Sequence, residues 1–273
     1  MQSLSFDTMV KYYEETRVFD RVSFNSALDF LIEKYPPNLF TKLFEPGIGT
    51  GRIAIPLAER GYQVTGVDIS QEMLECLGSR LTVHKANLPM FYQCADVTQL
   101  PFLDRSFDIV IAVHLFYFIK EWKLAVNEIL RVLKTGGKLV LMHTGTGSEV
   151  PALNQRYKEL CAIRGFQIKD IGVKSTQEVI SYLTEIGYET EIAKNRWTWN
   201  QNINLKKAIE YIRLRAYSFT QTTPEKVHLS VIETLTQELE SQYGSLDTEV
   251  KIPNQIYFVF TSCHSELTHN RRK

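Results

Sequence analysis

The chain has 273 residues, enough for one large α/β domain with an insertion or for two small domains. Its 31 lysines and arginines balance its 31 aspartates and glutamates, so no global field draws it to nucleic acid or to an anionic membrane, although a local basic patch remains open. The four cysteines lie far apart without a C-x-x-C pair, which argues against a zinc site or a disulfide scaffold, and we expect no metal. Without a cationic and apolar leader or a run of about 18 apolar residues, the sequence predicts a soluble, cytoplasmic protein.

The first predicted elements are helices within residues 6–35. Apolar side chains such as Val18 and Leu28 recur there at roughly helical spacing. Pro36 and Pro37 end the pattern, because proline cannot continue a helix.

The next segment, which ends at Asp68, reads as strand, glycine loop, helix, strand and acid. An apolar run from Leu43 enters a loop with Gly47, Gly49 and Gly51. Glycines let a ligand lie against bare backbone amides, and the loop delivers it to the positive end of the next helix. Asp68 then ends the neighbouring strand, where a carboxylate can accept hydrogen bonds from both ribose hydroxyls. The segment therefore predicts a nucleoside-binding unit.

The spacing of this loop discriminates between ligands. A dinucleotide fingerprint, G-x-G-x-x-G, would have its third glycine at position 52, which is Arg52. Glu45 precedes the glycines and would repel the pyrophosphate of NAD or FAD. It would attract a ligand that carries an ammonium group and no phosphate, such as S-adenosylmethionine (SAM).

A second acid follows at the same predicted edge. Ser70 to Leu81 reads as a helix with Ser70 as its N-cap. The strand Phe91 to Cys94 then delivers Asp96 to the edge that carries Asp68.

The following strand, Asp108 to Val113, is rich in β-branched residues, as expected of a strand buried on both faces, and it leads to His114. We expect Asp108 to have a structural role, holding backbone amides of the glycine loop. An amphipathic helix from Trp122 to Leu133 and a fifth strand from Lys138 to His143 complete this part.

Beyond Gly147 the pattern is weaker. The predicted elements are helices at Leu153–Arg164 and Thr176–Ile186, a strand at Thr190–Trp197, helical stretches at Leu205–Tyr217 and Pro224–Tyr243, and a final strand at Ile256–Ser262. A doubly wound sheet needs only a tight link between its last two strands, so we interpret the two helical stretches as an insertion.

The motifs EPGIGTGR, GVDIS, ADVTQLPFLDRSFDIVIAVH and RVLKTGGKLVL occur in this order within residues 40–145. The chain resembles the class I SAM-dependent methyltransferases, particularly the small-molecule branch of the methyltransferase type 11 kind. The resemblance implies a Rossmann-like α/β fold with a doubly wound, mostly parallel seven-stranded sheet and a helical lid inserted before the last strand. The implied parts are a helical cap over the cofactor site (1–37), the SAM-binding core (38–200 and 250–264), the lid (201–249) and a disordered tail (265–273).

The resemblance also implies which residues contact the cofactor. Asp96, or the amide beside it, reads the adenine amino group, which is a hydrogen-bond donor, and Ile69 packs on adenine. Tyr13 and Arg17 reach the carboxylate end of SAM, unless they belong to a surface helix. Arg52 faces the amino-acid end or is solvated. The full predicted set is Tyr13, Arg17, Glu45, Gly47, Gly49, Gly51, Arg52, Asp68, Ile69, Met73, Asp96, Val97 and His114.

Methyl transfer from SAM is an in-line displacement at an activated carbon, so alignment and the exclusion of water supply most of the acceleration. A general base is needed only if the acceptor is protonated at the working pH. His114 is the candidate base, because we expect a titratable group with a pKa near neutrality at the catalytic edge. It is alternatively a pocket wall, a cofactor contact or a structural histidine, and His143 is a second candidate base.

The substrate candidates lie on and beside the insertion, and they are Trp197, Trp199, Arg213, Arg215 and Tyr217. The arginines would suit a substrate with a carboxylate or a phosphate, and the alternative is an exposed cationic face.

Three other functions compete with small-molecule methylation. A methyltransferase of RNA or protein is disfavoured by the zero net charge and by the absence of an appended basic domain. A SAM-binding sensor or scaffold without turnover has the same glycine loop, so the sequence leaves it open. A nicotinamide oxidoreductase is disfavoured by Glu45 and Arg52. We expect a small-molecule acceptor, no nucleic acid, no membrane, and a monomer or homodimer.

Overall fold

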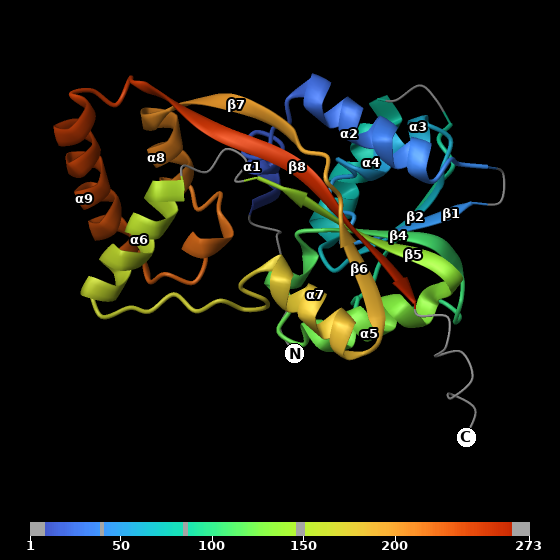
Figure 1. Ribbon diagram of the computed structural model, residues 1–273. Helices are drawn as coiled ribbons and strands as arrows, with labels where there is room; N and C mark the ends of the chain where they lie inside the picture. Colours follow the sequence, from blue (N-terminus) through green and yellow to red (C-terminus); the bar gives the residue numbers. More distant parts are fainter. Residues whose placement is uncertain (1–8, 39–40, 84–86, 146–150, 264–273) are drawn as a thin grey trace.

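The computed structural model describes residues 9–38, 41–83, 87–145 and 151–263 (Figure 1). The segment predicted as a disordered tail, 265–273, lies outside these residues, as does the start of the predicted N-terminal cap.

A central sheet has the strand order β3-β2-β1-β4-β5-β8-β6, and β7 pairs with β8 away from this path. The first five strands are parallel, and β8 is antiparallel to both β5 and β6. The chain reverses its direction of winding between β1 and β4, which is where open α/β sheets bind their ligands. The strands are β1 (Lys42–Pro46), β2 (Gln63–Asp68), β3 (Met90–Cys94), β4 (Phe107–Val113), β5 (Leu133–Thr144), β6 (Tyr188–Ile192), β7 (Trp197–Asn204) and β8 (Glu249–Cys263).

Helices cover both faces of the sheet, so the doubly wound α/β fold predicted from the sequence is confirmed (Figure 1). Among the described residues the sheet has eight strands and not the predicted seven, because β7 adds to β8. One face packs against α2 (Arg21–Lys34), α3 (Ala54–Glu59) and α4 (Gln71–Val83). The other packs against α5 (Trp122–Val132) and α7 (Thr176–Glu185). The predicted N-cap of α4 is present, since the Ser70 hydroxyl accepts a hydrogen bond from the Met73 amide at 3.1 Å.

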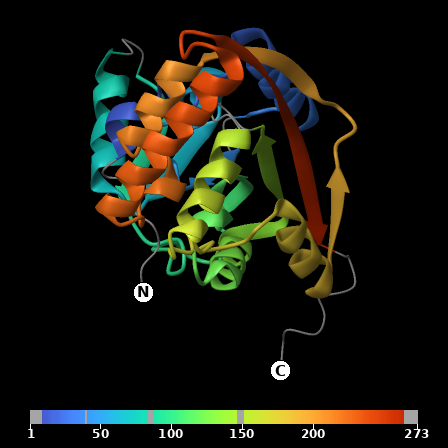
Figure 2. The same cartoon turned by 90° about the vertical axis from the view of Figure 1, so that its left-hand side faces the viewer.

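A third hydrophobic cluster lies beside the sheet, within a group that we call the helical unit. It consists of α6 (Pro151–Ile163), α8 (Leu205–Arg213), the 3₁₀ turn η3 (Ser218–Thr220) and α9 (Glu225–Tyr243). Figure 2, viewed from this side, shows α6, α8 and α9 in front of the sheet. The predicted insertion, 201–249, contains α8 and α9, but α6 also packs with them and comes from an earlier part of the chain.

The last strands differ most from the sequence prediction. The predicted strand Thr190–Trp197 is divided, because β6 ends at Ile192 and β7 begins at Trp197. β8 begins well before the predicted Ile256. It contains Pro253, a residue that argues against a strand when read from the sequence. Among the described residues, β8 pairs at Pro253 with β7 alone.

Asp108 is structural, but its partners differ from the expected ones. Its carboxylate accepts a hydrogen bond from the Lys42 amide at 2.9 Å and forms an ion pair with Lys134 at 2.8 Å. It therefore ties β4 to the start of β1 and to β5, and not to the glycine loop.

Within the described ranges, no helix combines the length and the apolar character that crossing a membrane requires.

Candidate cofactor and acceptor site

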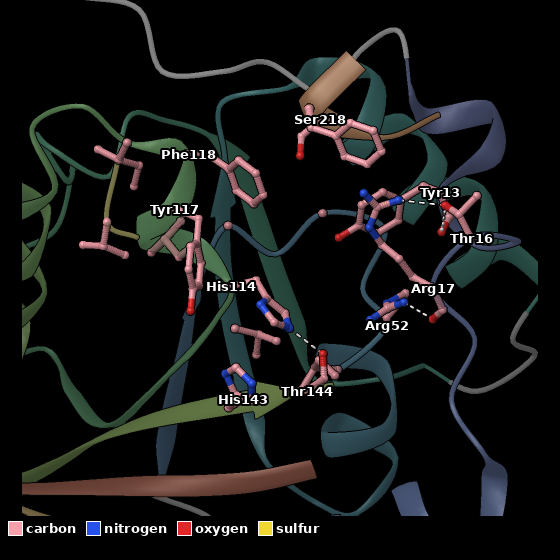
Figure 3. Close-up of a pocket in the computed structure, with 18 of the residues that line it drawn as sticks. Tyr13, Thr16, Arg17, Arg52, His114, Tyr117, Phe118, His143, Thr144 and Ser218 are labelled. Carbon is pink, nitrogen blue, oxygen red and sulfur yellow. Dashed lines mark hydrogen bonds between the residues drawn. The ribbon is translucent and has the colours of Figure 1, made fainter. Parts of the chain in front are cut away.

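A cavity of about 1150 Å³ lies where the carboxyl ends of β1, β2, β4 and β5 face the helical unit. Figure 3 shows Tyr13, Arg17 and Arg52 on one side of it, His143 and Tyr117 on the other, and His114 between them. Typical pockets for one small ligand have roughly 300–1,000 Å³, so this cavity has room for a cofactor and a second molecule. All predicted cofactor residues except Gly51 line it.

The glycine loop is fixed to the end of β2. The amides of Gly47 and Ile48 both donate to the Val67 carbonyl, at 2.8 and 2.9 Å. The Gly49 amide donates to the Asp68 carboxylate at 2.8 Å. Gly51 has a φ of +78°, and a Cβ there would lie 2.5 Å from a methyl group of Leu77. The absence of a side chain at Gly51 therefore lets the loop pack closely against Leu77 of α4.

The two acids of the sheet edge present their carboxylates to the same cavity. Asp68 accepts hydrogen bonds from the Gly49 and Ser70 amides, one on each oxygen, and each oxygen can accept more than one bond. Within the described residues the hydrogen bonds of Asp96 go to Oδ1, which accepts from the amide and the hydroxyl of Thr98, both at 2.8 Å. Its Oδ2 atom is available for a ligand.

Glu45 is buried at the end of β1, with 3 % of its surface exposed. Its Oε2 atom has no hydrogen-bond partner in the described part of the chain. Burial raises the pKa of this carboxyl well above its usual value, Asp68 raises it further, and Arg52 opposes both. An ammonium group in the cavity would satisfy this orphaned oxygen, so the residues present fit SAM.

The opposite wall is cationic and aromatic. The Arg52 guanidinium lies 4.4 Å from the ring centroid of Phe19 and 5.6 Å from that of Tyr13, and it donates to the Arg17 carbonyl. Arg17 stacks on Tyr13 at 4.4 Å and donates to the Thr16 hydroxyl. Burial lowers the pKa of Arg52, which remains charged because its ordinary pKa is so high.

The described residues that precede α2, which we call the N-terminal segment, join the glycine loop to the helical unit. Glu14 pairs with Arg80 at 2.7 Å and accepts a hydrogen bond from the Thr50 hydroxyl. The next residue, Glu15, accepts a hydrogen bond from the Tyr211 hydroxyl at 2.6 Å. This segment therefore lies along the cofactor side of the cavity and contacts α8.

His114 follows β4 in a left-handed conformation, with a φ of 51°. Its Nε2 atom forms a hydrogen bond with the Thr144 hydroxyl (Figure 3). Burial, followed by the charges of His143, Arg52 and Arg17, lowers the pKa of His114 to about 3. The expected pKa near neutrality is therefore wrong, and the ring is neutral at pH 7.

His143 lies beside His114, with ring centroids 5.6 Å apart, and also lines the cavity. Its Nδ1 atom is 3.4 Å from the Thr176 hydroxyl, which is 3.1 Å from the Tyr117 hydroxyl. Burial and Arg196 lower the pKa of His143 below its ordinary value.

Of the predicted substrate residues, Trp199 lines the cavity and the others do not. Trp197 packs against the rings of Phe30 and Phe258. The remaining three belong to the helical unit, where internal contacts engage them.

Within that unit, Tyr217 is buried and stacks on Phe219 at 5.5 Å. Arg215 donates to the carbonyls of Thr220 and Thr223 and pairs with Glu225 at 2.8 Å. Arg213 is exposed and lies 3.6 Å from Glu210.

Several cavity residues were missed by the sequence analysis because they come from loops and elements far apart in the chain. The missed residues include Thr16, Phe19, Tyr117, Phe118, Thr144, Lys158, Lys169, Lys174, Asn200, Phe219 and Asn254. Only Tyr117 and Phe118 carried a signal, since aromatic residues directly follow the strand that opens onto the predicted pocket.

Residues 44–141 match the family model described as "Methyltransferase domain". An uncharacterized methyltransferase of Mycobacterium bovis is 26 % identical over 238 residues, which cover 87 % of this chain and 86 % of that protein. The YcgJ protein of Bacillus subtilis has a similar structure, with a TM-score of 0.59, 20 % identity, and coverage of 88 % of this chain and 99 % of the other.

A Haemonchus contortus phosphoethanolamine N-methyltransferase, solved with phosphomonomethylethanolamine and S-adenosylhomocysteine (SAH), has a TM-score of 0.52 and 22 % identity. It covers 94 % of this chain, which spans 57 % of that one.

Residues 44–141 therefore form a methyltransferase domain, and the fold, the site and these matches support a class I SAM-dependent methyltransferase.

Proposed function

We propose that the protein transfers the methyl group of SAM to a small-molecule acceptor. The observation that carries this proposal is the composition of the cavity wall. The same cavity is lined by the glycine loop and by Phe219 of the helical unit, Trp199 of β7 and Asn254 of β8. An acceptor in the second part would be covered by the helical unit, which suits a small molecule better than a polymer. The Haemonchus enzyme, with a small phosphorylated amine in its structure, is consistent with this reading.

In this proposal Asp68 binds the ribose hydroxyls and Asp96 binds the adenine amino group through Oδ2, with Ile69, Met73 and Val97 against the base. The buried Glu45 carboxylate binds the ammonium group of the cofactor. Arg17, Arg52 and Tyr13 bind its carboxylate end. The support is that these groups line the same cavity, with the anionic groups at the sheet edge and the cations opposite them.

Bound SAM supplies a methyl group that its sulfonium has activated. The chain then has to align the acceptor and exclude water. We propose that neutral His114, held by Thr144, forms the wall at this point and does not act as the base. A ring with a pKa of about 3 is a weak proton acceptor at neutral pH. His143 is the remaining histidine of the cavity, and it serves as the proton acceptor if the acceptor group is protonated.

We also propose that the N-terminal segment is the cap over the cofactor and that the helical unit is the lid over the acceptor. The contacts of Glu14 and Glu15 support the first part, because they join the segment to the glycine loop and to α8. The lining role of Ser218 and Phe219 supports the second.

The experiment is a transfer assay with radiolabelled SAM and three acceptor pools: small metabolites, total RNA and total protein. We expect label in the small-molecule fraction, and less of it with Asp68→Ala at limiting SAM. Label in RNA or protein alone would contradict the small-molecule proposal. Tight SAH binding without transfer to any pool would favour a sensor.

A further inference from the structure

The loop from Ile168 to Lys174, between α6 and α7, lines the cavity but carries none of the predicted site residues. It brings Lys169, Asp170 and Lys174 to the cavity wall, where α6 adds Lys158. None of these groups belongs to the proposed cofactor site.

The position of this loop is fixed by the turn that follows β4, the 3₁₀ turn η2 (Leu115–Phe118). The amides of Gly172 and Val173 donate to the carbonyls of Tyr117 and Phe116, both at 3.1 Å. A Cβ at Gly172 would overlap the Phe116 carbonyl oxygen, so only glycine permits this approach. The loop is thus joined to the same turn that carries Tyr117 and Phe118 into the cavity.

The charges of this wall are unbalanced. Lys158 lies 3.5 Å from Asp170, so these two form an ion pair. Lys169 and Lys174 are exposed, and no ion pair engages the ammonium group of either one among the described residues. The Glu178 carboxylate, which lies outside the cavity lining, accepts a hydrogen bond from the Lys174 backbone amide at 2.9 Å. The lining of this wall therefore has three lysines and one acid, Asp170.

No other carboxylate of the described cavity wall balances these two lysines. The remaining acids, Glu45, Asp68 and Asp96, stand at the proposed cofactor end. The rest of the acceptor end is uncharged apart from the histidines. It consists of the aromatic residues Tyr117, Phe118, Trp199 and Phe219 and of polar residues such as Asn200 and Asn254. A protonated amine would meet repulsion here, whereas an anion would meet attraction.

We propose that the acceptor is an amphipathic anion, with an aromatic or apolar body against the aromatic wall and a carboxylate, sulfonate or phosphate held by Lys169 and Lys174. This inference rests on the proposed function, since it describes the acceptor that occupies the second part of the cavity. Lysine is suited to this role because its ammonium group offers several donors to an anionic oxygen.

The test uses two probes on the SAH-saturated protein. 8-Anilinonaphthalene-1-sulfonate has an aromatic body and a sulfonate, and N-phenyl-1-naphthylamine has the same body without the charge. We expect fluorescence titration to show tighter binding of the sulfonate. The double variant Lys169→Glu, Lys174→Glu should bind the sulfonate at least about tenfold more weakly, the effect of losing one charge-assisted hydrogen bond or more. Its affinity for the neutral probe and for SAH should not change.

Lys226→Glu is the matched control, because Lys226 is an exposed lysine of α9 outside the cavity. It should bind both probes like the wild type. If the double variant fails to fold, the milder double variant Lys169→Met, Lys174→Met should also lose affinity for the sulfonate selectively, by a smaller factor.

Equal loss of both probes, or unchanged sulfonate binding by the folded double variant, would overturn the inference while leaving the proposed function intact. Absence of SAH binding by the wild type would instead contradict the proposed function itself.

Discussion

His114 should make the fold sensitive to acid. Its folded-state pKa of about 3 lies below the ordinary value of 6.5, so the unfolded chain binds a proton more readily. The stability that depends on the neutral ring is present above pH 6.5 and is lost as the pH falls toward 3. One pKa unit corresponds to about 1.4 kcal/mol, so at about pH 5 the loss from this residue is up to ~2 kcal/mol. This is an upper bound, because the ring borders a cavity that admits water.

The variant His114→Asn removes the titrating ring, and asparagine tolerates the left-handed φ of 51° at this position. Urea unfolding should be measured near pH 7.5 and near pH 5 for both proteins. Because burial also lowers the pKa of His143 and His228, the variant will still lose stability in acid. The loss between the two pH values should be smaller than in the wild type by up to ~2 kcal/mol. Equal losses would refute the assignment of a neutral His114 ring with a lowered pKa.

Three further predictions concern the same site and the helical unit. Burial raises the pKa of Glu45, and an ammonium group beside it favours the ionised carboxylate, so SAH binding should release a proton wherever Glu45 is protonated in the free protein. The calorimetric enthalpy, measured across a series of pH values, should then depend on the buffer in part of that series. In Glu45→Gln it should not, and a wild-type enthalpy independent of the buffer at every pH would contradict the ammonium contact. Gly51→Ala should lower the free energy of unfolding by about 2–4 kcal/mol. Gly136 has a similar φ of +80° and open space around it, so Gly136→Ala should lower that free energy by only about 1–2 kcal/mol. Equal losses in urea unfolding would argue against the close packing at Gly51. Arg215→Ala should lower the free energy of unfolding by about 2–3 kcal/mol without changing probe or acceptor binding. Arg213 is exposed, so Arg213→Ala should change that free energy by less than about 0.5 kcal/mol. Selective loss of acceptor binding in Arg215→Ala would restore the predicted substrate role of Arg215.

The cofactor half of the site was predictable because its signals are local. Glycine is required at several nearby positions of positive φ, Asp68 is the last residue of β2, and Asp96 lies two residues after β3. Parallel strands place their carboxyl ends at one edge, so sequence order alone brings these residues together. The cavity wall has this arrangement, and the binding roles of its residues remain predictions.

The acceptor half was not predictable in the same way. The loop from Ile168 to Lys174 reaches the cavity through backbone hydrogen bonds to η2, about fifty residues earlier in the chain, and these leave no pattern in the side chains. Arg215 carries the residue type of a ligand contact, but its guanidinium binds nearby carbonyls of its own segment. Residue type alone does not separate these two cases.

The pKa of His114 was also not predictable from the sequence. The sequence places it correctly after β4, whereas its pKa depends on burial and on the charges of Arg17, Arg52 and His143, which come from other elements. A near-neutral pKa is the expectation for a solvated ring, and the enclosed ring departs from it.

The most direct test of the account is calorimetric titration of SAH into the wild type, Asp68→Asn, Asp68→Ala and the control Asp247→Ala. Asp247 is exposed and lies outside the cavity. We predict micromolar binding by the wild type and the control, weaker binding by Asp68→Asn, and a loss of at least about tenfold in Asp68→Ala, the effect of losing a charge-assisted hydrogen bond. Failure of the wild type to bind, or equal binding by Asp68→Ala, would contradict the claim that the glycine loop and Asp68 hold the cofactor.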